Sequence, residues 1–221
     1  MDAQDKLQEL ERLRAQVQQL EAEVVKEEAE RGWQASGYYT AYYATAGFML
    51  GIFGAMTSLL ANVVCAPIAG KTPLELIRIY LTFPLGEKAL ELTTTGQPVY
   101  AVGDGVILAI GCCLYLGTGM LLGIPVYMTI ARFARRRGLF ARLLVGSIVS
   151  LAIWGINFYG ILSWLQPILV GGDPGNWITN SNYLPWWVAA ATHLVFGWTI
   201  AVLYPLGEYT PYRRVSRVSA A

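Results

Sequence analysis

Four polar side chains lie within or beside long apolar stretches of this 221-residue sequence, where they could support chemistry inside a membrane. They are Asn62, Asp104, Asn157 and His193, the only histidine. An ionisable group at membrane depth costs roughly 3 kcal/mol to insert, so such a group faces protein and is by default a functional residue. Counting about 1.5 Å per helical residue, all four lie toward the end of their segments that is assigned below to the outer side. We therefore expect one polar cluster in the outer half of a membrane domain.

His193 supports two main interpretations. In the structural one, its imidazole hydrogen-bonds a partner such as Asn157 and fixes the register of the helices. In the functional one, it lines an outward-facing polar cavity of a small transporter or channel, together with Asn62, Asp104 and Asn157. The spacing of Ala189 and His193 also resembles the helix spacing that ligates chlorophyll-type pigments. A pigment- or haem-binding subunit with His193 as the single ligand is thus a further alternative, and no other cofactor is predicted.

Sequence patterns for hydrolysis, phosphate binding and metal binding are absent. There is no GxSxG, HExxH or P-loop motif, and no pair of carboxylates sits within an apolar segment. Cys65, Cys112 and Cys113 form no CxxC pair and lie in or beside apolar runs, where cysteine behaves as a small hydrophobe. We predict neither an enzyme nor a metal site.

The composition indicates a membrane protein. Hydrophobic residues make up 55% of the chain and charged residues only 14%, against about 25% charged in an average soluble domain. The net charge of +1 excludes a basic nucleic-acid binder, so no nucleic-acid partner is expected. Four apolar segments, at about 44–66, 101–131, 143–167 and 185–207, each reach the roughly 20 helical residues that cross a bilayer. The sequence thus predicts an all-α integral membrane protein with a four-helix transmembrane bundle in residues 44–207.

Small residues recur at four-residue intervals along each apolar segment. Such rows let membrane helices approach closely, which matters because lipid removes the hydrophobic drive between them. We interpret the four rows as the inward faces of one bundle. The glycines expected to pack there are Gly47, Gly51, Gly105, Gly117, Gly146 and Gly197.

Lysine and arginine set the predicted orientation. With four crossings and both termini in the cytoplasm, thirteen basic residues lie inside and three outside, in line with the positive-inside rule. This arrangement fits the inner (plasma) membrane of a bacterium and places the basic tail 208–221 inside. The loop after the second span then offers its arginines to anionic lipid headgroups. These arginines are Arg132, Arg135, Arg136 and Arg137.

Residues 1–31 predict a separate cytoplasmic helix. They contain no glycine or proline, and apolar residues recur among them in heptads, which is typical of a coiled-coil seam. The seam consists of Leu10, Leu13, Val17, Leu20 and Val24. Its expected partner is another membrane subunit or a second copy of the chain. Residues 32–43 hold one tryptophan and four tyrosines, typical of an aromatic belt at the membrane interface.

Between the first two spans, residues 73–83 predict an apolar helix that is too short to cross and lies in the outer interface. Helices that pack closely, a heptad seam and the lack of catalytic motifs together favour a non-catalytic subunit. We expect the protein to pack in or scaffold a multi-subunit membrane complex, such as an energy-transducing one. Its partners would be membrane lipids and other membrane subunits.

Overall fold

All regular secondary structure in the described part of the chain is helical. The computed structural model describes residues 3–31, 39–86, 89, 102–170 and 177–209, and no strand occurs among them. This confirms the all-α class predicted from the sequence. The chain forms two units, residues 1–38 with 210–221 and residues 39–209, and each is described by itself.

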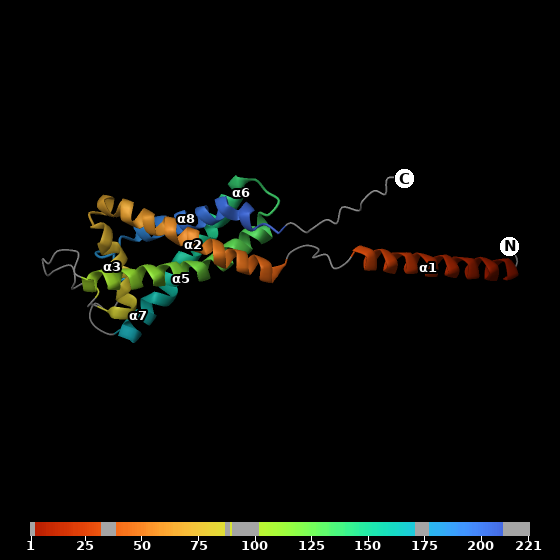
Figure 1. The fold of residues 1–221 in the computed structure, drawn as a ribbon, viewed down its shortest axis with the longest axis horizontal. Helices are drawn as coiled ribbons and strands as arrows, with labels where there is room; N and C mark the ends of the chain where they lie inside the picture. Colours follow the sequence, from red (N-terminus) through yellow and green to blue (C-terminus); the bar gives the residue numbers. More distant parts are fainter. Residues whose placement is uncertain (1–2, 32–38, 87–88, 90–101, 171–176, 210–221) are drawn as a thin grey trace. The chain divides into compact units, whose positions relative to one another are not determined.

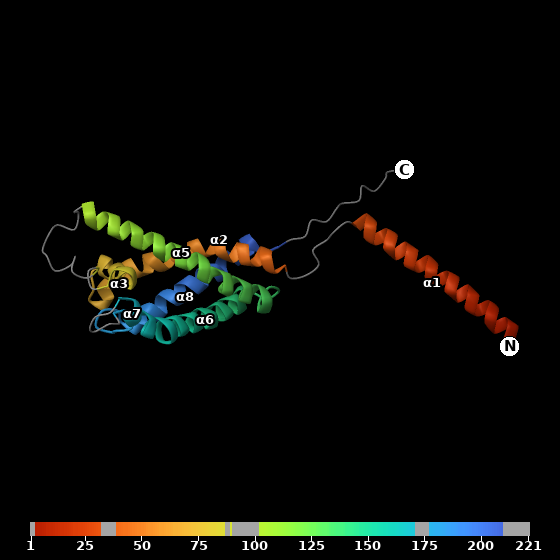
Figure 2. The same ribbon diagram turned by 90° about the horizontal axis from the view of Figure 1, so that it is seen from below.

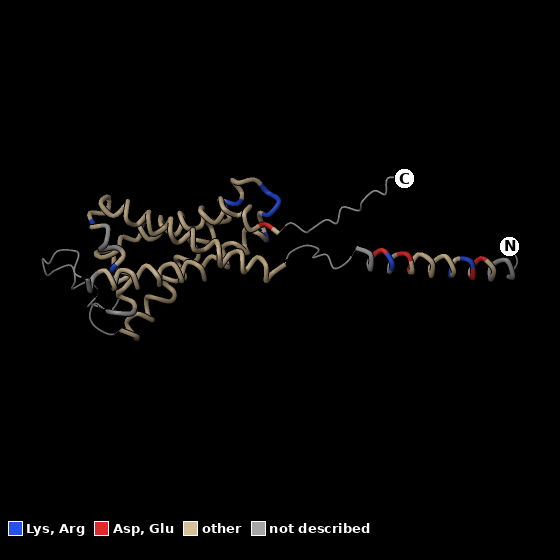
Figure 3. The backbone as a smooth tube through the Cα atoms, viewed as in Figure 1, with Lys and Arg blue, Asp and Glu red and all other residues tan. Residues whose placement is uncertain are grey.

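The first unit is built around α1 (Ala3–Arg31), a helix of 29 residues. It is rich in Glu, Gln, Leu, Ala and Arg, all of which favour helix, and charges of both signs occur along its length (Figure 3). Among the described residues of this unit, no other helix covers the predicted seam. Its members Leu10, Leu13, Val17 and Leu20 are 44–61% exposed, whereas the side chain of Val24 lies outside the described residues.

The second unit holds four helical stretches that are long and apolar enough to cross a membrane. They are α2 (Thr40–Cys65) with η1 (Ala66–Ala69), α5 (Val102–Phe133), α6 (Leu139–Gly155) with η2 (Ile156–Leu162) and α7 (Ser163–Val170), and α8 (Trp186–Leu203) with η3 (Tyr204–Gly207). They correspond to the four predicted segments and are consistent with a multi-pass membrane protein. α2 begins at Thr40, so the last residues of the predicted aromatic belt form its first turn.

The four helices are arranged in the order α5, α2, α8, α6 (Figures 1 and 2). α2 packs along α5 and α8, and α6 packs along α8. α5 and α6 meet near the short turn at residues 134–138 and diverge from it, as Figure 2 shows. The side between α5 and α6 is therefore the open side of the bundle. Below, the end that holds this turn is called the turn end, and the opposite end is called the α3 end.

The crossing of α2 and α5 depends on glycine. A Cβ added to Gly47 would lie 2.8 Å from the carbonyl oxygen of Gly123. A Cβ added to Gly51 would collide with the carbonyl oxygen of Gly119. The two backbones touch, and only residues without a side chain allow such an approach.

The α5 residues in this crossing differ from the predicted ones. Gly105 and Gly117 have no atom within 4 Å of an added Cβ, so neither packs against a neighbouring helix. The reason is helix geometry: each four-residue step overshoots a full turn by about 40°, so the predicted row winds around α5. Gly117 faces away from α2, Gly105 lies near the far end of α5, and Gly119 and Gly123 make the contact instead.

The crossing of α6 and α8 has a similar basis. A Cβ added to Gly146 would lie 3.0 Å from the carbonyl oxygen of Gly197, and a Cβ on Gly197 would collide with the hydroxyl of Ser150. Nearby, Trp198 Nε1 donates a hydrogen bond of 2.7 Å to Ser147 Oγ. Both predicted glycines of this pair therefore lie at a helix contact.

α3 (Pro73–Leu85) folds back across the α3 end and contacts α2, α5 and α7. It is the helix predicted at 73–83, two residues longer. Gly70, with a φ of +68°, reverses the chain before it. Leu81 and Thr82 are buried, and Gln166 of α7 donates a 2.9 Å hydrogen bond to Thr82 Oγ1 while it accepts one from the Ile178 backbone. α3 is thus bound to the bundle by apolar packing and by a buried amide.

The turn end is closed by three buried tyrosines. Tyr43, Tyr127 and Tyr204 are fully buried, and the rings of Tyr127 and Tyr204 stack with their centroids 5.1 Å apart. The hydroxyl of Tyr127 donates to the carbonyl oxygen of Tyr204 at 2.9 Å. Arg142 lies over the Tyr204 ring, 4.6 Å from its centroid, which adds a cation–π contact.

Arg135, one of the four arginines predicted to contact lipid headgroups, instead binds other groups of the protein. Arg135 pairs with Glu208 at 3.5 Å and donates to the backbone oxygen of Tyr209 at 3.1 Å. The acidic residue follows the last helix directly, so it reaches Arg135 and competes with lipid phosphate for its charge. The other three remain exposed: Arg132, Arg136 and Arg137.

Candidate functional site

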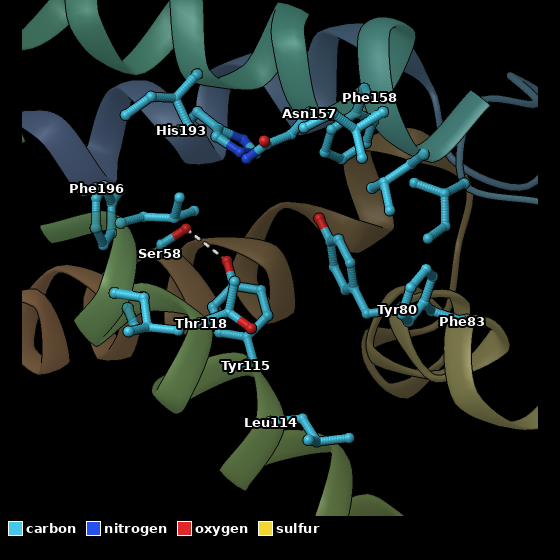
Figure 4. Close-up of a pocket in the computed structure, with 18 of the residues that line it drawn as sticks. Ser58, Tyr80, Phe83, Leu114, Tyr115, Thr118, Asn157, Phe158, His193 and Phe196 are labelled. Carbon is cyan, nitrogen blue, oxygen red and sulfur yellow. Dashed lines mark hydrogen bonds between the residues drawn. The ribbon is translucent and has the colours of Figure 1, made fainter. Parts of the chain in front are cut away.

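A cavity of about 610 Å³ lies inside the second unit, between α2, α3, α5, the α6–η2 helix and α8 (Figure 4). Its walls are mainly apolar and aromatic, and no Asp, Glu, Lys or Arg is among the described residues that line it. The polar residues that line it are Ser58, Tyr80, Tyr115, Thr118, Ser150, Asn157 and His193. The volume falls within the range of about 300–1,000 Å³ that is typical of small-molecule sites.

The cavity opens between α5 and η2. Leu114, Thr118 and Leu121 of α5 line it and are exposed, as is Ile161 of η2. These helices border the open side of the bundle. The cavity is therefore reached from the side of the bundle rather than past the ends of the helices.

His193 presents one free ring nitrogen to this cavity. Its Nδ1 lies 2.7 Å from the carbonyl oxygen of Ala189, one turn earlier on α8. A carbonyl oxygen can only accept, so Nδ1 carries the proton in this contact and a neutral ring leaves Nε2 as a lone-pair acceptor. The ring packs edge-on against Phe158, with centroids 5.5 Å apart.

The predicted hydrogen bond between His193 and Asn157 is not formed. Asn157 lines the same cavity, and its amide has no hydrogen-bond partner among the described residues. The imidazole is held by its own helix instead, because the Ala189 carbonyl lies directly below it. The structure thus brings His193 and Asn157 to one cavity without joining them.

Asn157 belongs to an unusual element. η2 (Ile156–Leu162) is a π-helix, and four of its seven residues line the cavity: Asn157, Phe158, Ile161 and Leu162. π-helical turns are rare and occur frequently at functional sites. Gly160, a poor helix former, lies within the segment.

Asn62 lies behind the cavity wall in a polar network. Ser58 Oγ donates to the carbonyl oxygen of Thr192 at 2.9 Å and accepts from the Tyr115 hydroxyl at 2.7 Å. Asn62 Nδ2 donates to the Ser58 carbonyl at 3.2 Å and to Tyr115 Oη at 3.4 Å. The network joins α2, α5 and α8 inside the bundle. The hydroxyls of Ser58 and Tyr115 thus make their hydrogen bonds with other groups of the protein.

Tyr80 reaches the cavity from α3. Its ring meets that of Tyr115 edge-on at 5.3 Å, and Figure 4 shows its hydroxyl pointing into the space that His193 and Asn157 face. The hydroxyl is buried and makes no hydrogen bond of good geometry with a described residue, although the side chains of Thr192 and Asn62 lie close enough to lower its pKa slightly. Burial raises the pKa of Tyr80, and the neighbouring Tyr115 raises it further, so the hydroxyl stays protonated and can donate.

Two of these cavity residues, His193 and Asn157, belong to the polar cluster predicted from the sequence, and Asn62, a third member, lies behind the cavity wall. The side chain of Asp104, the fourth member of the predicted cluster, lies outside the described residues. Ser58, Tyr115 and Tyr80 also line the cavity but were not predicted as site residues. Ser58 and Tyr115 offered a signal as polar groups in apolar spans, whereas Tyr80 depends on where α3 docks.

No described residue that lines the cavity is Lys or Arg, so a haem bound there would find no cation for its two propionates. Nor do three or more His, Cys, Asp or Glu side chains gather at a metal-ligand distance anywhere in the described ranges. The arrangement suits a neutral molecule with a small polar part.

No protein-family model, curated protein or solved structure matches this chain. The fold by itself defines a class: an all-helical protein with four helices long and apolar enough to span a membrane, consistent with a multi-pass membrane protein.

Proposed function

We propose that this chain is a non-catalytic, multi-pass membrane subunit that packs in or scaffolds a larger membrane complex, such as an energy-transducing one. The observation that carries the proposal is the apolar heptad seam of α1, whose four described members are 44–61% exposed within the first unit. An apolar stripe on a charged helix gains stability only when another helix covers it.

The seam residues favour a parallel pair of α1 helices. Val17 occupies an a position, and Leu13 and Leu20 occupy d positions, a combination that favours two strands. Glu9 and Arg14 fall at flanking g and e positions and carry opposite charges across such a pair, and an exposed ion pair adds about 0.2–1 kcal/mol. The first partner to test is therefore a second copy of the chain.

The double variant Val17→Asp with Leu20→Asp is expected to abolish self-association or partner recovery, because it places charges in the middle of the seam. The control adds the same two charges at the outward f positions, as Ala15→Asp with Ala22→Asp. Mass measurement in detergent and pull-down from native membranes give the readout. If the seam variant keeps the oligomer size and the partner recovery of the control, the proposal fails.

The orientation of the spans is a second prediction. We propose that both termini face the cytoplasm, on the basis of the thirteen-to-three distribution of basic residues. In a variant whose three native cysteines are replaced by serine, Asn180→Cys is expected to react with an impermeant maleimide in intact cells. Arg136→Cys is expected to react only after the cells are opened. If Arg136→Cys reacts in intact cells and Asn180→Cys does not, the proposed orientation is wrong.

A small transporter or channel is the second candidate function, because His193 and Asn157 do line one cavity. The apolar walls and the lack of charge on the described lining favour an apolar occupant over an ion. Solute flux into liposomes that contain the purified protein would distinguish the two functions.

A further inference from the structure

The cavity around His193 has features of a ligand site that the role of a packing subunit does not explain. Polar groups that face an apolar cavity without partners are costly, since each loses its hydrogen bonds to water. Here three such groups converge, namely His193 Nε2, the Asn157 amide and the Tyr80 hydroxyl, while the unpaired hydroxyl of Ser150 lies against Gly197 at the contact of α6 and α8. Their neighbours Ser58 and Tyr115 are paired with each other, so the unpaired set is a distinct part of the lining.

We propose that this cavity binds a quinol, a neutral aromatic ring with two hydroxyl groups and an apolar tail, taken up from the bilayer. The site would hold the ring between α3, α8 and η2 and leave the tail at the opening beside α5. The proposal concerns ligand binding alone and does not depend on the partner of α1.

Charge is the first argument. A phospholipid and a haem both carry phosphate or carboxylate groups, and the described lining offers no cation to either. A quinol is neutral, so its burial between Phe158, Phe196 and Tyr115 costs no charge desolvation. Aromatic walls also favour a flat ring over a saturated chain.

Hydrogen bonding is the second argument, and it separates a hydroxyl from a carbonyl. Because Nδ1 of His193 donates to Ala189, the neutral ring can only accept at Nε2. The ligand group beside it must therefore carry a proton, as a quinol hydroxyl does and a quinone carbonyl does not. The protonated Tyr80 hydroxyl and the Asn157 amide supply the donors that the ligand oxygens need.

Position is the third argument. Two of the polar groups lie together on α8 and η2, and the Tyr80 hydroxyl points toward them from α3 across the cavity (Figure 4). A ring with an oxygen at each of two opposite positions can form hydrogen bonds with the polar groups on both sides of the cavity. A molecule with a single hydroxyl can form them on one side only. The opening between α5 and η2 leads to the lipid-facing side, where a quinol with an apolar tail is dissolved.

The π-helix gives the fourth argument. A seven-residue π-helix leaves the α-helical hydrogen-bond pattern, and such turns are frequent at functional sites. This one lies on the cavity wall and contributes both Asn157 and Phe158, the residue that packs on His193.

The test uses the full chain in phospholipid nanodiscs, under anaerobic conditions with a chemical reductant. The probes are radiolabelled decyl-benzoquinol and its dimethyl ether, which keeps both oxygens but has no hydroxyl proton; empty discs correct for partitioning. We expect saturable binding of one quinol per chain, and about tenfold weaker binding of the ether, since one hydrogen bond is worth about that factor.

Variants then assign the hydrogen bond to His193. His193→Phe is expected to weaken quinol binding about tenfold and to leave the ether unchanged, whereas Asn157→Leu weakens both probes. Val202→Phe, at an exposed position of α8 outside the lining, is the matched control and should bind as wild type. If His193→Phe does not fold, Thr118→Trp at the exposed opening provides a second variant, which is expected to block both probes.

Equal affinity for quinol and ether, or wild-type quinol binding in both His193→Phe and Thr118→Trp, would overturn the proposal. So would binding of haemin with a Soret shift that depends on His193, in a protein that takes up no quinol. The variant Val17→Asp with Leu20→Asp should bind quinol normally, so failure of the seam and failure of this site remain distinguishable.

Discussion

Replacing Gly51 with alanine is expected to force α2 and α5 apart and to destabilise the whole bundle. The new Cβ would collide with the carbonyl oxygen of Gly119 and lie 2.8 Å from the Cα of Met120. Both are backbone atoms, so no side-chain rotation relieves the contact. Overpacking of this kind costs about 1–3 kcal/mol, which corresponds to roughly 2–10 °C in melting temperature for a protein of this size. Thermal unfolding of the purified protein in detergent measures the effect.

Gly117→Ala is the matched control for this prediction. It adds the same methyl group to a span helix, but no atom lies within 4 Å of the added Cβ. Alanine favours helix by up to about 1 kcal/mol over glycine, so this variant should be as stable as wild type or more stable. If Gly51→Ala unfolds at the same temperature as Gly117→Ala, the close crossing of α2 and α5 is wrong.

These two glycines also show what the sequence could and could not reveal about the fold. The spans and α1 were predictable because apolar length, charge distribution and helix propensity act along the chain. The choice of contacting face on α5 was not, since every small residue there satisfies the same spacing rule. Gly119 and Gly123 are selected over Gly105 and Gly117 by the position of α2, which the sequence of α5 does not contain.

The residues of the candidate site likewise include some that the sequence predicts and some that it does not. His193 and Asn157 stood out as polar groups in apolar segments, and the cost of exposing them to lipid directs them inward. Tyr80 gains its place only because α3 folds back over the bundle, held in part by the hydrogen bond from Gln166 to Thr82. The π-helical turn that carries Asn157 left no signal in the pattern, because an apolar segment with evenly spread hydrophobicity fits an α-helix and a π-helix alike.

The arginines illustrate a further limit of reasoning from composition. Counting them predicted an orientation, but their count does not say which of them the protein itself uses. Arg135 is drawn into the fold by Glu208, and Arg142 by the face of Tyr204. The headgroup contacts proposed for the loop therefore rest on Arg132, Arg136 and Arg137.

Replacing Tyr127 with alanine is the other change for which we expect a large loss of stability. The ring is fully buried between Tyr43 and Tyr204, with centroid distances of 6.1 Å and 5.1 Å, and its hydroxyl donates to the Tyr204 carbonyl. Deleting a buried aromatic ring removes its packing and leaves a cavity, which together cost about 3–5 kcal/mol. Unfolding in mixed detergent micelles at increasing SDS fraction measures this free energy.

Tyr127→Phe separates the hydroxyl from the ring. It keeps the stacking on Tyr204 and loses one hydrogen bond, so a loss of about 1 kcal/mol is expected. Tyr159→Ala, at a tyrosine that is 51% exposed, controls for the removal of an aromatic ring from the surface and should cost less than Tyr127→Ala. Because α2, α5 and the end of α8 meet at these three tyrosines, Tyr127→Ala should also release the turn end to proteolysis while the α3 end stays protected. Equal stability of Tyr127→Ala and Tyr159→Ala would contradict the packing of the turn end around Tyr127.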